Sequence, residues 1–478
     1  MKILYAASEA LPFAASGGLA DVVGSLPTAV AQEGHDCRVV LPLYRCVKPD
    51  VRNTLTYLTD ITVDVSWRKQ YCGIYTKKVG NVQYYLLDNP YYFMRDGMYG
   101  FYDDCERFVF FSRAVLEILP VIGFHPDIIH CNDWQTAMIP VFYRVLYQYH
   151  QEFANIRTVY TIHNIQYQGI YGKEVVSELM GLPTYHINLL EYDGSINLMK
   201  GAIETADQIS TVSPSYAKEI LDPWYSYGMD RALVRHQDSI AGILNGIDVK
   251  SYNPETDSNL EANYSISKIG NKKTCRKALL QEMQLQPMDG PVIGIVTRFV
   301  GHKGISLIQQ AFEEILSLGM QDVQFLHLFV ILGSGEKIFE DFFTEMQFQY
   351  PKQVHTTLGF QPALARRIYA GADLFLMPSQ NEPCGLAQMV AMRYGTIPIV
   401  RETGGLKDSV TDAGDPSGNG FTFKTYDAGD MLDAVKRACA LFADKRKWNA
   451  LVKRAMSCDF SWDHSALDYI AMYENLIS

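Results

Sequence analysis

The segment from Ser379 to Asp408, SQNEPCGLAQMVAMRYGTIPIVRETGGLKD, constrains the fold more strongly than any other part of the sequence. It begins with a loop that carries Glu382, continues into a run of helical character, and reaches the short apolar strand Ile397–Val400. A second, glycine-rich turn follows at Thr403–Gly405. This order of elements forms one α/β unit with both loops at the same sheet edge, where ligands of such folds bind. We therefore expect Glu382 and the turn to face one small molecule.

The alternation of buried strands and helices occurs twice along the chain. The strand Lys2–Ala7, a glycine-rich turn and the helix Asp21–Glu33 open the first series, and the strand Pro291–Thr297 opens the second. A chain of 478 residues is also too long for one ordinary hydrophobic core. The predicted fold class is therefore α/β, with two Rossmann-like domains that face each other across a deep interdomain cleft. The predicted parts are residues 1–248, residues 249–455, and a C-terminal helix within residues 456–478 that packs back on the body.

The charge and the cysteine content argue against several classes of protein. Lys and Arg number 42 against 53 Asp and Glu, and the net charge of −11 argues against non-specific binding to nucleic acid. Nine cysteines without CxxC spacing indicate reduced thiols. The N-terminus lacks the features of a signal peptide, and no apolar run approaches the roughly 18 residues that span a bilayer. We expect a cytoplasmic protein without nucleic-acid or membrane partners.

Candidate ligand-binding residues follow several predicted strands of the first half. The pair Gly17–Gly18 opens a helix whose free backbone N–H groups suit an anion. His163 ends the β-branched strand Thr158–Ile162, and Asp133 with Trp134 occupies the equivalent place one strand earlier. A single histidine at a strand end is often purely structural, so both roles stay open for His163 at this point.

Two cations lie on the loop after the strand that opens the second half. Arg298 and Lys303 are flanked by glycines in a chain that is acidic overall. Arginine offers a planar fork and lysine a compact charge, and a pyrophosphate requires such a pair. The two cations stabilise a leaving phosphate more strongly as its negative charge grows in the transition state. Solvated surface charges are the alternative interpretation, and the position of the pair at a strand–helix junction favours phosphate binding.

Other reaction classes lack the residues they need. The histidines are scattered, no cluster has metal-ligand spacing, and no cofactor is predicted. No GxSxG sequence is present to support a Ser-His-Asp triad. A retaining glycosidase needs two carboxylates about 5 Å apart, and only Glu382 has a suitable setting. The residues therefore favour a metal-free transferase that acts on a phosphate-activated donor.

The chain resembles the bacterial glycogen synthases and plant starch synthases over essentially its whole length. The stretches that carry the resemblance are SGGLADVVGSLP, HCNDWQ, TIHNIQYQG, ISTVSPSYAKEI, GILNGID, RFVGHKG and PSQNEPCGLAQMVAMRYGTIPIVRETGGLKDSV. The resemblance implies the GT-B architecture, with residues 1–248 on the acceptor side and 249–455 on the donor side. It also implies a hexosyltransferase that moves glucose from ADP-glucose to the non-reducing end of an α-1,4-glucan, with retention and without metal.

The resemblance implies a role for each catalytic candidate. Arg298 and Lys303 resemble the pair that holds the donor pyrophosphate. Glu382 resembles the carboxylate that binds hydroxyls of the donor glucose. His163 matches the histidine whose backbone carbonyl lies near the anomeric carbon and steadies its positive charge.

The resemblance also implies further binding residues. Gly17 and Gly18 match a phosphate-facing turn with Asp21 on the helix that follows, whereas Asp133 and Trp134 match the sugar and acceptor side. The remaining donor-binding residues are implied to be Asn245, Phe360 as a platform for adenine, the amides of Cys384, Gly385 and Leu386, and the turn of Thr403, Gly404 and Gly405.

Three positions depart from the family pattern. Ala15 stands where the family has lysine, Gln380 where it has arginine, and Gln135 where it has histidine. A charge-assisted hydrogen bond contributes roughly 1.5–3 kcal/mol, so the loss of a cation beside a phosphate site matters. The alternatives are therefore an enzyme of the same fold that uses UDP-glucose or another acceptor, or a weakly active or non-catalytic glucan-binding homologue.

Overall fold

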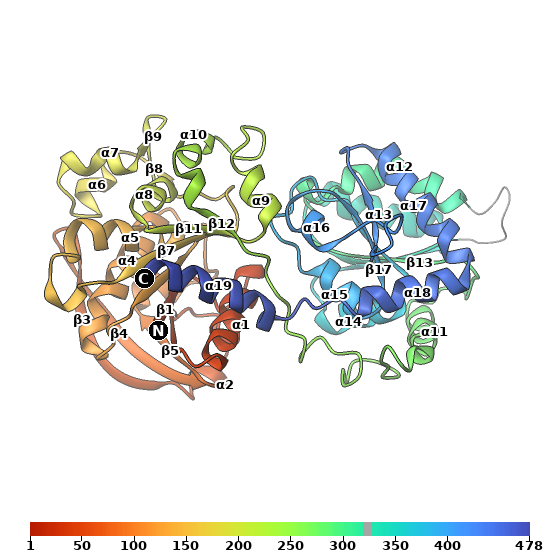
Figure 1. Ribbon diagram of the computed structural model, residues 1–478, viewed down its shortest axis with the longest axis horizontal. Helices are drawn as coiled ribbons and strands as arrows, with labels where there is room; N and C mark the ends of the chain where they lie inside the picture. The colour runs from red at the N-terminus through yellow and green to blue at the C-terminus, as the bar shows by residue number, and fades with distance from the viewer. Residues whose placement is uncertain (319–326) are drawn as a thin grey trace. The chain divides into compact units, whose positions relative to one another are not determined.

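The computed structural model describes residues 1–318 and 327–478, which form two compact units (Figure 1). The first unit comprises Met1–Gly246 and Trp462–Ser478, and the second comprises Ile247–Ser461. The sequence analysis places the boundary after Asp248 instead of Gly246. The last segment of the chain returns to the first unit as the helix α19 (Trp462–Ile477). The cleft expected between the two halves stays a prediction.

The first unit is built on a nine-stranded sheet with the order β12-β11-β7-β6-β1-β2-β5-β4-β3. Its strands from β12 to β5 are parallel, and β4 and β3 add an antiparallel hairpin at one edge. The strands are β1 (Lys2–Ala6), β2 (Asp36–Pro42), β3 (Thr56–Val65), β4 (Arg68–Val79), β5 (Val82–Asp88), β6 (Ile128–Asn132), β7 (Arg157–Ile162), β11 (Gln208–Thr211) and β12 (Ile240–Gly242). A small second sheet contains β8 (Ile170–Tyr171), β9 (Glu191–Tyr192) and β10 (Ser195–Asn197).

The strand order of this sheet reverses between β1 and β6. The chain builds β2 and β5 on one side of β1, and then places β6, β7, β11 and β12 on the other side. All five residues of β6 are buried, as are the last four of β1, because a central parallel strand is covered on both faces. The loops after β1 and β6 diverge at the carboxyl edge, which is where open α/β sheets bind ligands.

Helices cover the first sheet, and the last of them comes from the C-terminus. They are α1 (Gly18–Gln32), α2 (Pro49–Arg52), α3 (Pro90–Phe93), α4 (Asp104–Val121), α5 (Met138–Phe142), α6 (Val175–Glu178), α7 (Ile187–Leu190), α8 (Leu198–Thr205), α9 (Pro214–Glu219), α10 (Asp230–Leu233) and α19. Trp462, Tyr469 and Tyr473 of α19 belong to the same buried cluster as Ile3 and Tyr5 of β1. The N-terminal core is therefore completed by the last residues of the chain.

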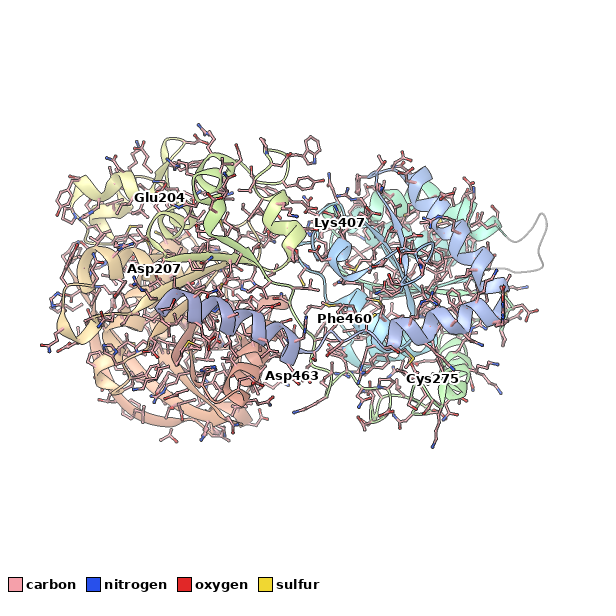
Figure 2. All side chains as sticks on the ribbon, viewed as in Figure 1. Glu204, Asp207, Cys275, Lys407, Phe460 and Asp463 are labelled. Atoms are coloured by element: carbon pink, nitrogen blue, oxygen red, sulfur yellow. The ribbon has the colours of Figure 1, made fainter. Side chains whose placement is uncertain are left out.

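Buried polar contacts fix the centre of this unit. The fully buried His130 on β6 is bonded through Nδ1 to the Tyr473 hydroxyl at 2.7 Å and through Nε2 to the Thr161 hydroxyl at 2.5 Å. Burial lowers the pKa of His130 to about 3, so its ring is neutral. Asp207, labelled in Figure 2, accepts hydrogen bonds from the backbone and hydroxyl of Thr158 at 2.8 and 3.0 Å and so ties β11 to β7.

The second unit contains a six-stranded, fully parallel sheet with the order β15-β14-β13-β16-β17-β18. The strands are β13 (Val292–Val296), β14 (Leu328–Gly333), β15 (Val354–Leu358), β16 (Leu374–Met377), β17 (Ile397–Arg401) and β18 (Phe421–Phe423). The order reverses between β13 and β16, as it does between β1 and β6 in the first unit. Each unit is thus a doubly wound Rossmann-like sheet with one switch point.

The helices of the second unit are α11 (Lys272–Glu282), α12 (Ile305–Ser317), α13 (Lys337–Gln349), α14 (Pro362–Gly371), α15 (Ala387–Arg393), α16 (Gly404–Ser409), α17 (Ala428–Ala443) and α18 (Lys445–Met456). The half-buried Lys272 at the start of α11 donates hydrogen bonds to the carbonyls of Ala370 and Tyr394 at 2.9 and 3.1 Å. This lysine therefore joins α11 to the ends of α14 and α15. Within residues 1–318 and 327–478, no helix is both long enough and apolar enough to cross a membrane.

We expect Tyr473→Phe to lower the free energy of unfolding of the first unit by about 1–3 kcal/mol, because it leaves Nδ1 of the buried His130 without a partner. Chemical denaturation measures this change. Tyr160→Phe is the matched control: its hydroxyl is buried and has no hydrogen-bond partner among the residues that the structure describes, so its removal is expected to be nearly neutral. Equal stability of the two variants would contradict the role given to Tyr473.

Candidate active site

The switch point of the second unit brings two predicted site residues into contact. Lys303 lies on the loop after β13, and Glu382 lies on the loop after β16. The Lys303 ammonium is 2.6 Å from Oε2 of Glu382, and the Ser379 hydroxyl donates to the same oxygen at 3.0 Å. Both charged groups are largely withdrawn from water, with 16% of the lysine and 8% of the glutamate side chain exposed. The adjacency of β13 and β16 therefore creates a fixed, partly buried ion pair.

Close backbone packing determines the shape of the loop that carries Lys303. Gly304 has a φ of +75°, and a Cβ atom at this position would lie 2.0 Å from the carbonyl oxygen of Pro378. The Gln380 amide donates to the carbonyl of His302 at 2.8 Å, which adds a second link between the loops. Only glycine allows this approach, since it has no Cβ and adopts positive φ without strain.

The turn at Thr403–Gly405 packs directly against the loop of Glu382. The Gly405 amide donates to the carbonyls of Glu382 and Pro383 at 3.2 and 3.1 Å. A Cβ at Gly404, which has a φ of +43°, would lie 2.1 Å from the Glu382 carbonyl oxygen. The prediction that these two loops share one sheet edge is confirmed by these contacts.

The segment from Cys384 to Leu386 turns the Glu382 loop into α15. Gly385 has a φ of +71°, and a Cβ there would lie 3.0 Å from Cγ of Glu382. The buried Gln388 donates to the carbonyl of Gly385 at 2.8 Å and to the hydroxyl of Ser409 at 3.0 Å. These contacts fix the backbone beside the carboxylate, whereas the donor-binding role of the amides stays a prediction.

Arg401 is a supporting residue that the sequence analysis did not identify. Its buried guanidinium donates to the carbonyls of Ser379 and Lys424 at 3.1 and 3.3 Å, and also to the carbonyl of Gln380. These acceptors are all main-chain oxygens, so this cation holds the loop in place. The sequence feature that could have identified it is an arginine at the end of an otherwise apolar strand.

Arg298 and Phe360 lie on loops at the same edge of this sheet. Arg298 is exposed, and its guanidinium makes no hydrogen bond or ion pair with any residue that the structure describes. The Phe360 ring follows β15 and is 90% exposed. Arg298 therefore differs from Lys303, whose charge already has a partner. Both side chains are accessible, and their predicted roles toward the donor stay predictions.

In the first unit the glycine-rich turn after β1 encloses a carboxylate. Glu9 is buried and accepts from the Ser16 amide at 2.5 Å, the Ser16 hydroxyl at 2.8 Å and the Gly17 amide at 3.3 Å. The Tyr99 hydroxyl also donates to it at 2.9 Å. The amides predicted to face a phosphate are thus already partly bound by an internal anion. The sequence feature that could have identified Glu9 is a single carboxylate in the apolar run after the first strand.

Gly18 begins α1 directly after this turn, and Asp21 lies in the first turn of that helix. A Cβ at either Gly17 or Gly18 would have no atom within 4 Å, so open space surrounds both glycines. The expected helix begins at Asp21, whereas the observed helix begins three positions earlier, at Gly18, where no side-chain cap marks its N-terminus. The phosphate-binding role of this turn stays a prediction.

Asp133 and His163 form the second contact between predicted site residues. Asp133 has a φ of +57°, and its Oδ1 accepts from the amides of His163 and Asn164 at 2.8 and 3.3 Å. The His163 ring is bonded through Nε2 to Oδ1 of Asn132 at 2.8 Å. The peptide of His163 is thereby held by a carboxylate from the neighbouring strand end.

Burial controls the charge of the Asp133 carboxyl and of the His163 ring. It raises the pKa of Asp133 to about 7, and the negative charge of Glu9 adds to this rise while the two amides oppose it. It lowers the pKa of His163 to about 3. The histidine is therefore neutral near pH 7, and its ring does not serve as a proton carrier there.

Two further predicted residues of the first unit are buried. The Trp134 ring packs edge-to-face on Phe108, with ring centroids 5.1 Å apart, and a Cβ at Gly169 would lie 2.7 Å from it. This packing alone accounts for the position of Trp134. Asn245 is buried, and its Oδ1 has no hydrogen-bond partner among residues 1–318 and 327–478, so an acceptor is available there.

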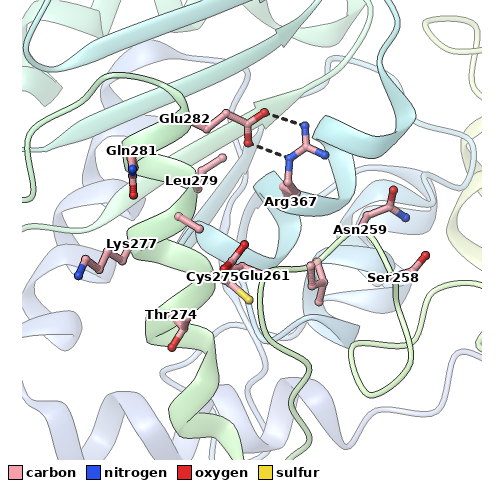
Figure 3. Close-up of a pocket in the computed structure, with 12 residues that line it drawn as sticks. Ser258, Asn259, Glu261, Thr274, Cys275, Lys277, Leu279, Gln281, Glu282 and Arg367 are labelled. Carbon is pink, nitrogen blue, oxygen red and sulfur yellow. Dashed lines mark hydrogen bonds and ion pairs between the residues drawn. The ribbon is translucent and has the colours of Figure 1, made fainter.

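A separate pocket of about 860 Å³ lies in the second unit between α11, α14 and residues 258–261 (Figure 3). The bidentate pair of Arg367 and Glu282, with bonds of 2.8 and 2.7 Å, joins the two helices at this pocket. The residues that line it include none of the predicted site residues. In the part of the chain that the structure describes, no group of three or more His, Cys, Asp or Glu is arranged to hold a metal ion.

The structure thus brings some of the predicted residues into contact within each unit. In the second unit, Lys303 and Glu382 meet beside Cys384, Gly404 and Gly405. In the first unit, Asp133 meets His163, and Glu9 connects them electrostatically to the turn at Gly17. The group in the second unit centres on the Lys303–Glu382 ion pair. The group in the first unit centres on the peptide of His163, which Asp133 holds in place.

Comparison with known proteins identifies relatives over the whole chain. Residues 2–235 match the starch synthase catalytic domain family, and residues 278–453 match the glycosyl transferases group 1 family. The chain is similar to the glycogen synthase of Alkaliphilus metalliredigens, with 45% identity over 482 residues that cover 100% of both chains.

The chain is also similar to solved structures over its whole length. The catalytic domain of starch synthase IV from Arabidopsis thaliana, bound to ADP and acarbose, is similar with a TM-score of 0.91, 36% identity and coverage of 99% of each chain. A sucrose-phosphate synthase from Thermosynechococcus elongatus has a TM-score of 0.62 at 18% identity, with coverage of 99% of this chain and 98% of its own, and shares the fold alone.

We expect Gly304→Ala to lower the free energy of unfolding by at least about 1 kcal/mol, because the new methyl group meets the Pro378 carbonyl and the backbone is left-handed. Gly301→Ala on the same loop is the matched control, since its Cβ would have no atom within 4 Å. Thermal unfolding measures the stability of both variants. Two variants of equal stability would show that the approach of the loops is not as tight as described.

The pKa of Asp133 makes stability depend on pH. Its folded pKa of about 7 lies above the ordinary value of 3.8, so its contribution to stability is present at low pH and is lost as the pH rises toward 7. Asp133→Asn keeps an oxygen for the His163 amide without the charge. We expect its melting temperature to fall less than that of the parent protein between pH 4 and 7. Asp341→Asn, at an exposed aspartate, is the control, and an unchanged pH dependence in Asp133→Asn would refute the assignment.

Proposed function

Because the chain belongs to the glycogen synthase and starch synthase family of GT-B glycosyltransferases, we propose that it transfers glucose from ADP-glucose to the non-reducing end of an α-1,4-glucan. The proposal includes retention of the anomeric configuration and catalysis without a metal ion or other cofactor. The observation that carries it is the ion pair of Lys303 and Glu382 at the switch point of the second unit. The ADP in the starch synthase IV structure supports the choice of nucleotide.

In the proposed reaction the second unit binds the donor. Arg298 and Lys303 bind its diphosphate, and their charges stabilise the leaving phosphate oxygen as the bond to the sugar breaks. Glu382 accepts hydrogen bonds from hydroxyls of the glucose. This division of roles is supported by the contact geometry, because one carboxylate held by a lysine is poorly suited to act as a nucleophile. The exposed Arg298 is available to meet the incoming anion first.

The first unit supplies a fixed dipole to the sugar. In the proposal the carbonyl of His163 stabilises the positive charge that develops at the anomeric carbon. The amide bonds to Asp133 support this role, because they hold the peptide rigid before the substrate arrives. The neutral ring, bonded to Asn132, is consistent with a role for the backbone instead of the imidazole.

In the proposed transfer, every bond and proton is accounted for without a basic side chain of the protein. The bond between the anomeric carbon and the phosphate oxygen breaks, and the 4-hydroxyl oxygen of the terminal glucan residue bonds to that carbon. The proton of this hydroxyl passes to the leaving phosphate oxygen on the same face of the sugar. This arrangement accounts for retention, and it needs no second carboxylate of the kind that glycosidases use.

A second candidate is the same transfer from UDP-glucose or to another acceptor. It is favoured by Ala15, which is exposed beside the glycine-rich turn and carries no charge, and by Gln380 in the Glu382 loop. The buried cation nearest Gln380 is Arg401, and its hydrogen bonds go to main-chain carbonyls. A non-catalytic glucan-binding role is less well supported, since the Lys303–Glu382 pair is intact.

The test is a donor panel with glycogen as acceptor. We expect incorporation of glucose from ADP-glucose, and we expect Lys303→Gln to lower kcat/KM by about 100-fold or more, the size of effect seen when one preorganised group for transition-state charge is removed. Lys337→Gln is the matched control, because this lysine is 81% exposed and pairs only with Asp341 on its own helix. Transfer from UDP-glucose alone would select the second candidate, and no transfer from any donor would refute both.

A further inference from the structure

His302 lies between Arg298 and Lys303 in the sequence, and its ring has no hydrogen-bond partner among the described residues. It occupies the middle of the short 3-10 turn Gly301–Lys303, and its side chain is half-buried. Its backbone carbonyl accepts the amide of Gln380, so the turn is fixed to the Glu382 loop. Neither ring nitrogen has a hydrogen-bond partner among residues 1–318 and 327–478.

This setting differs from that of the structural histidines in the same protein. His130 uses both ring nitrogens in buried hydrogen bonds, and His163 bonds to Asn132. Nε2 of His327 lies 3.1 Å from the Cys439 sulfur, while its buried Nδ1 has no partner among the described residues. A histidine that serves packing alone is normally satisfied in this way. The half-buried ring of His302 instead offers both nitrogens at the edge where the sheet binds its ligand.

Four charges act on the ring from three elements. Arg298 and Lys303 are on its own loop, Glu382 comes from the loop after β16, and Glu336 comes from the start of α13. Both carboxylates are already engaged, since Glu382 binds Lys303 at 2.6 Å and Glu336 accepts the Gly301 amide at 3.1 Å. Burial and the neighbouring cations lower the pKa of His302, and the two carboxylates oppose this only in part. The free protein therefore holds a neutral imidazole here at neutral pH.

A diphosphate would change this balance. Two additional negative charges bound by Arg298 and Lys303 would lie close to the ring and favour its protonated form. We propose that His302 is a third basic ligand of the donor's diphosphate, neutral in the free protein and protonated as the nucleotide sugar binds. This inference rests on the proposed function, because it takes the donor site to be at Arg298 and Lys303. It also supplies a cation to a site whose loop has Gln380 in place of arginine.

The proposal predicts how the affinity for the nucleotide sugar depends on pH. Binding takes up a proton wherever the ring is neutral in the free protein and charged in the complex, so affinity rises as the pH falls through that interval. One titrating group changes the affinity by at most about tenfold per pH unit. ADP-glucose is the suitable probe because both of its phosphates are esterified, and neither takes up a proton near neutral pH. ADP has a terminal phosphate that titrates in this range.

The experiment is calorimetry of ADP-glucose binding, without acceptor, between pH 6 and 8 in buffers of different ionisation enthalpy. We expect the parent protein to take up a fraction of one proton, and His302→Gln to take up none. We expect the variant to bind about three- to tenfold more weakly at pH 6 and nearly normally at pH 8. His302→Arg is expected to bind tightly at both pH values, because its charge is permanent. Thermal unfolding checks that both variants are folded.

His355→Gln is the matched control. This histidine is half-buried in the same unit, and its pKa is also lowered by burial, but the charged group acting on it is Glu282. We expect the control to retain the proton uptake. Uptake that persists in His302→Gln, or parent binding without uptake, would overturn the inference. Failure of every protein to bind ADP-glucose would overturn the proposed donor instead, so the two failures are distinguishable.

Discussion

The approach of main chain to main chain at the carboxyl edge of the second sheet is the constraint on which the candidate site depends. Loops after β13, β16 and β17 meet there at distances that leave no room for a Cβ at Gly304, Gly404 or Gly405. This packing sets the positions of Lys303 and Glu382 before any ligand is present. The ion pair between them is thus a result of backbone geometry, and the rigid loops make it a preorganised site.

The first unit uses the same switch point with different chemistry. Its glycine-rich turn surrounds the carboxylate of Glu9, which accepts hydrogen bonds from the amides of Ser16 and Gly17. Its strand ends carry Asp133 and His163, and burial keeps the histidine uncharged. The second unit therefore presents the charge of Arg298, whose side chain has no partner among the described residues, and the first unit presents an oriented peptide. Two copies of one fold have been specialised by the residues at their strand ends, as expected when function lies in sites placed on a common fold.

The sequence predicts the strands better than it predicts the contacts between loops. The apolar run of β17 was expected at Ile397–Val400 and is observed at Ile397–Arg401, because buried parallel strands are continuous hydrophobic segments. The start of α1 was placed too late because no side chain caps its N-terminus, so no local capping residue marks where the helix begins. The Lys303–Glu382 contact joins residues far apart in the chain and depends on β13 and β16 being neighbours. Strand order is not visible in a local pattern, and neither is the support that Arg401 gives to Ser379 and Gln380.

The return of α19 to the first unit has a consequence for biosynthesis. Trp462, Tyr469 and Tyr473 fill a core that begins at Ile3, so residues at both ends of the chain complete one hydrophobic cluster. A ribosome must therefore translate the whole second unit before the first can close its core. During that interval the nascent chain exposes the apolar surface of α1 and β1, and such surfaces attract chaperones or promote aggregation. A ribosome that stalls before Trp462 would release a chain whose first unit lacks part of its hydrophobic core.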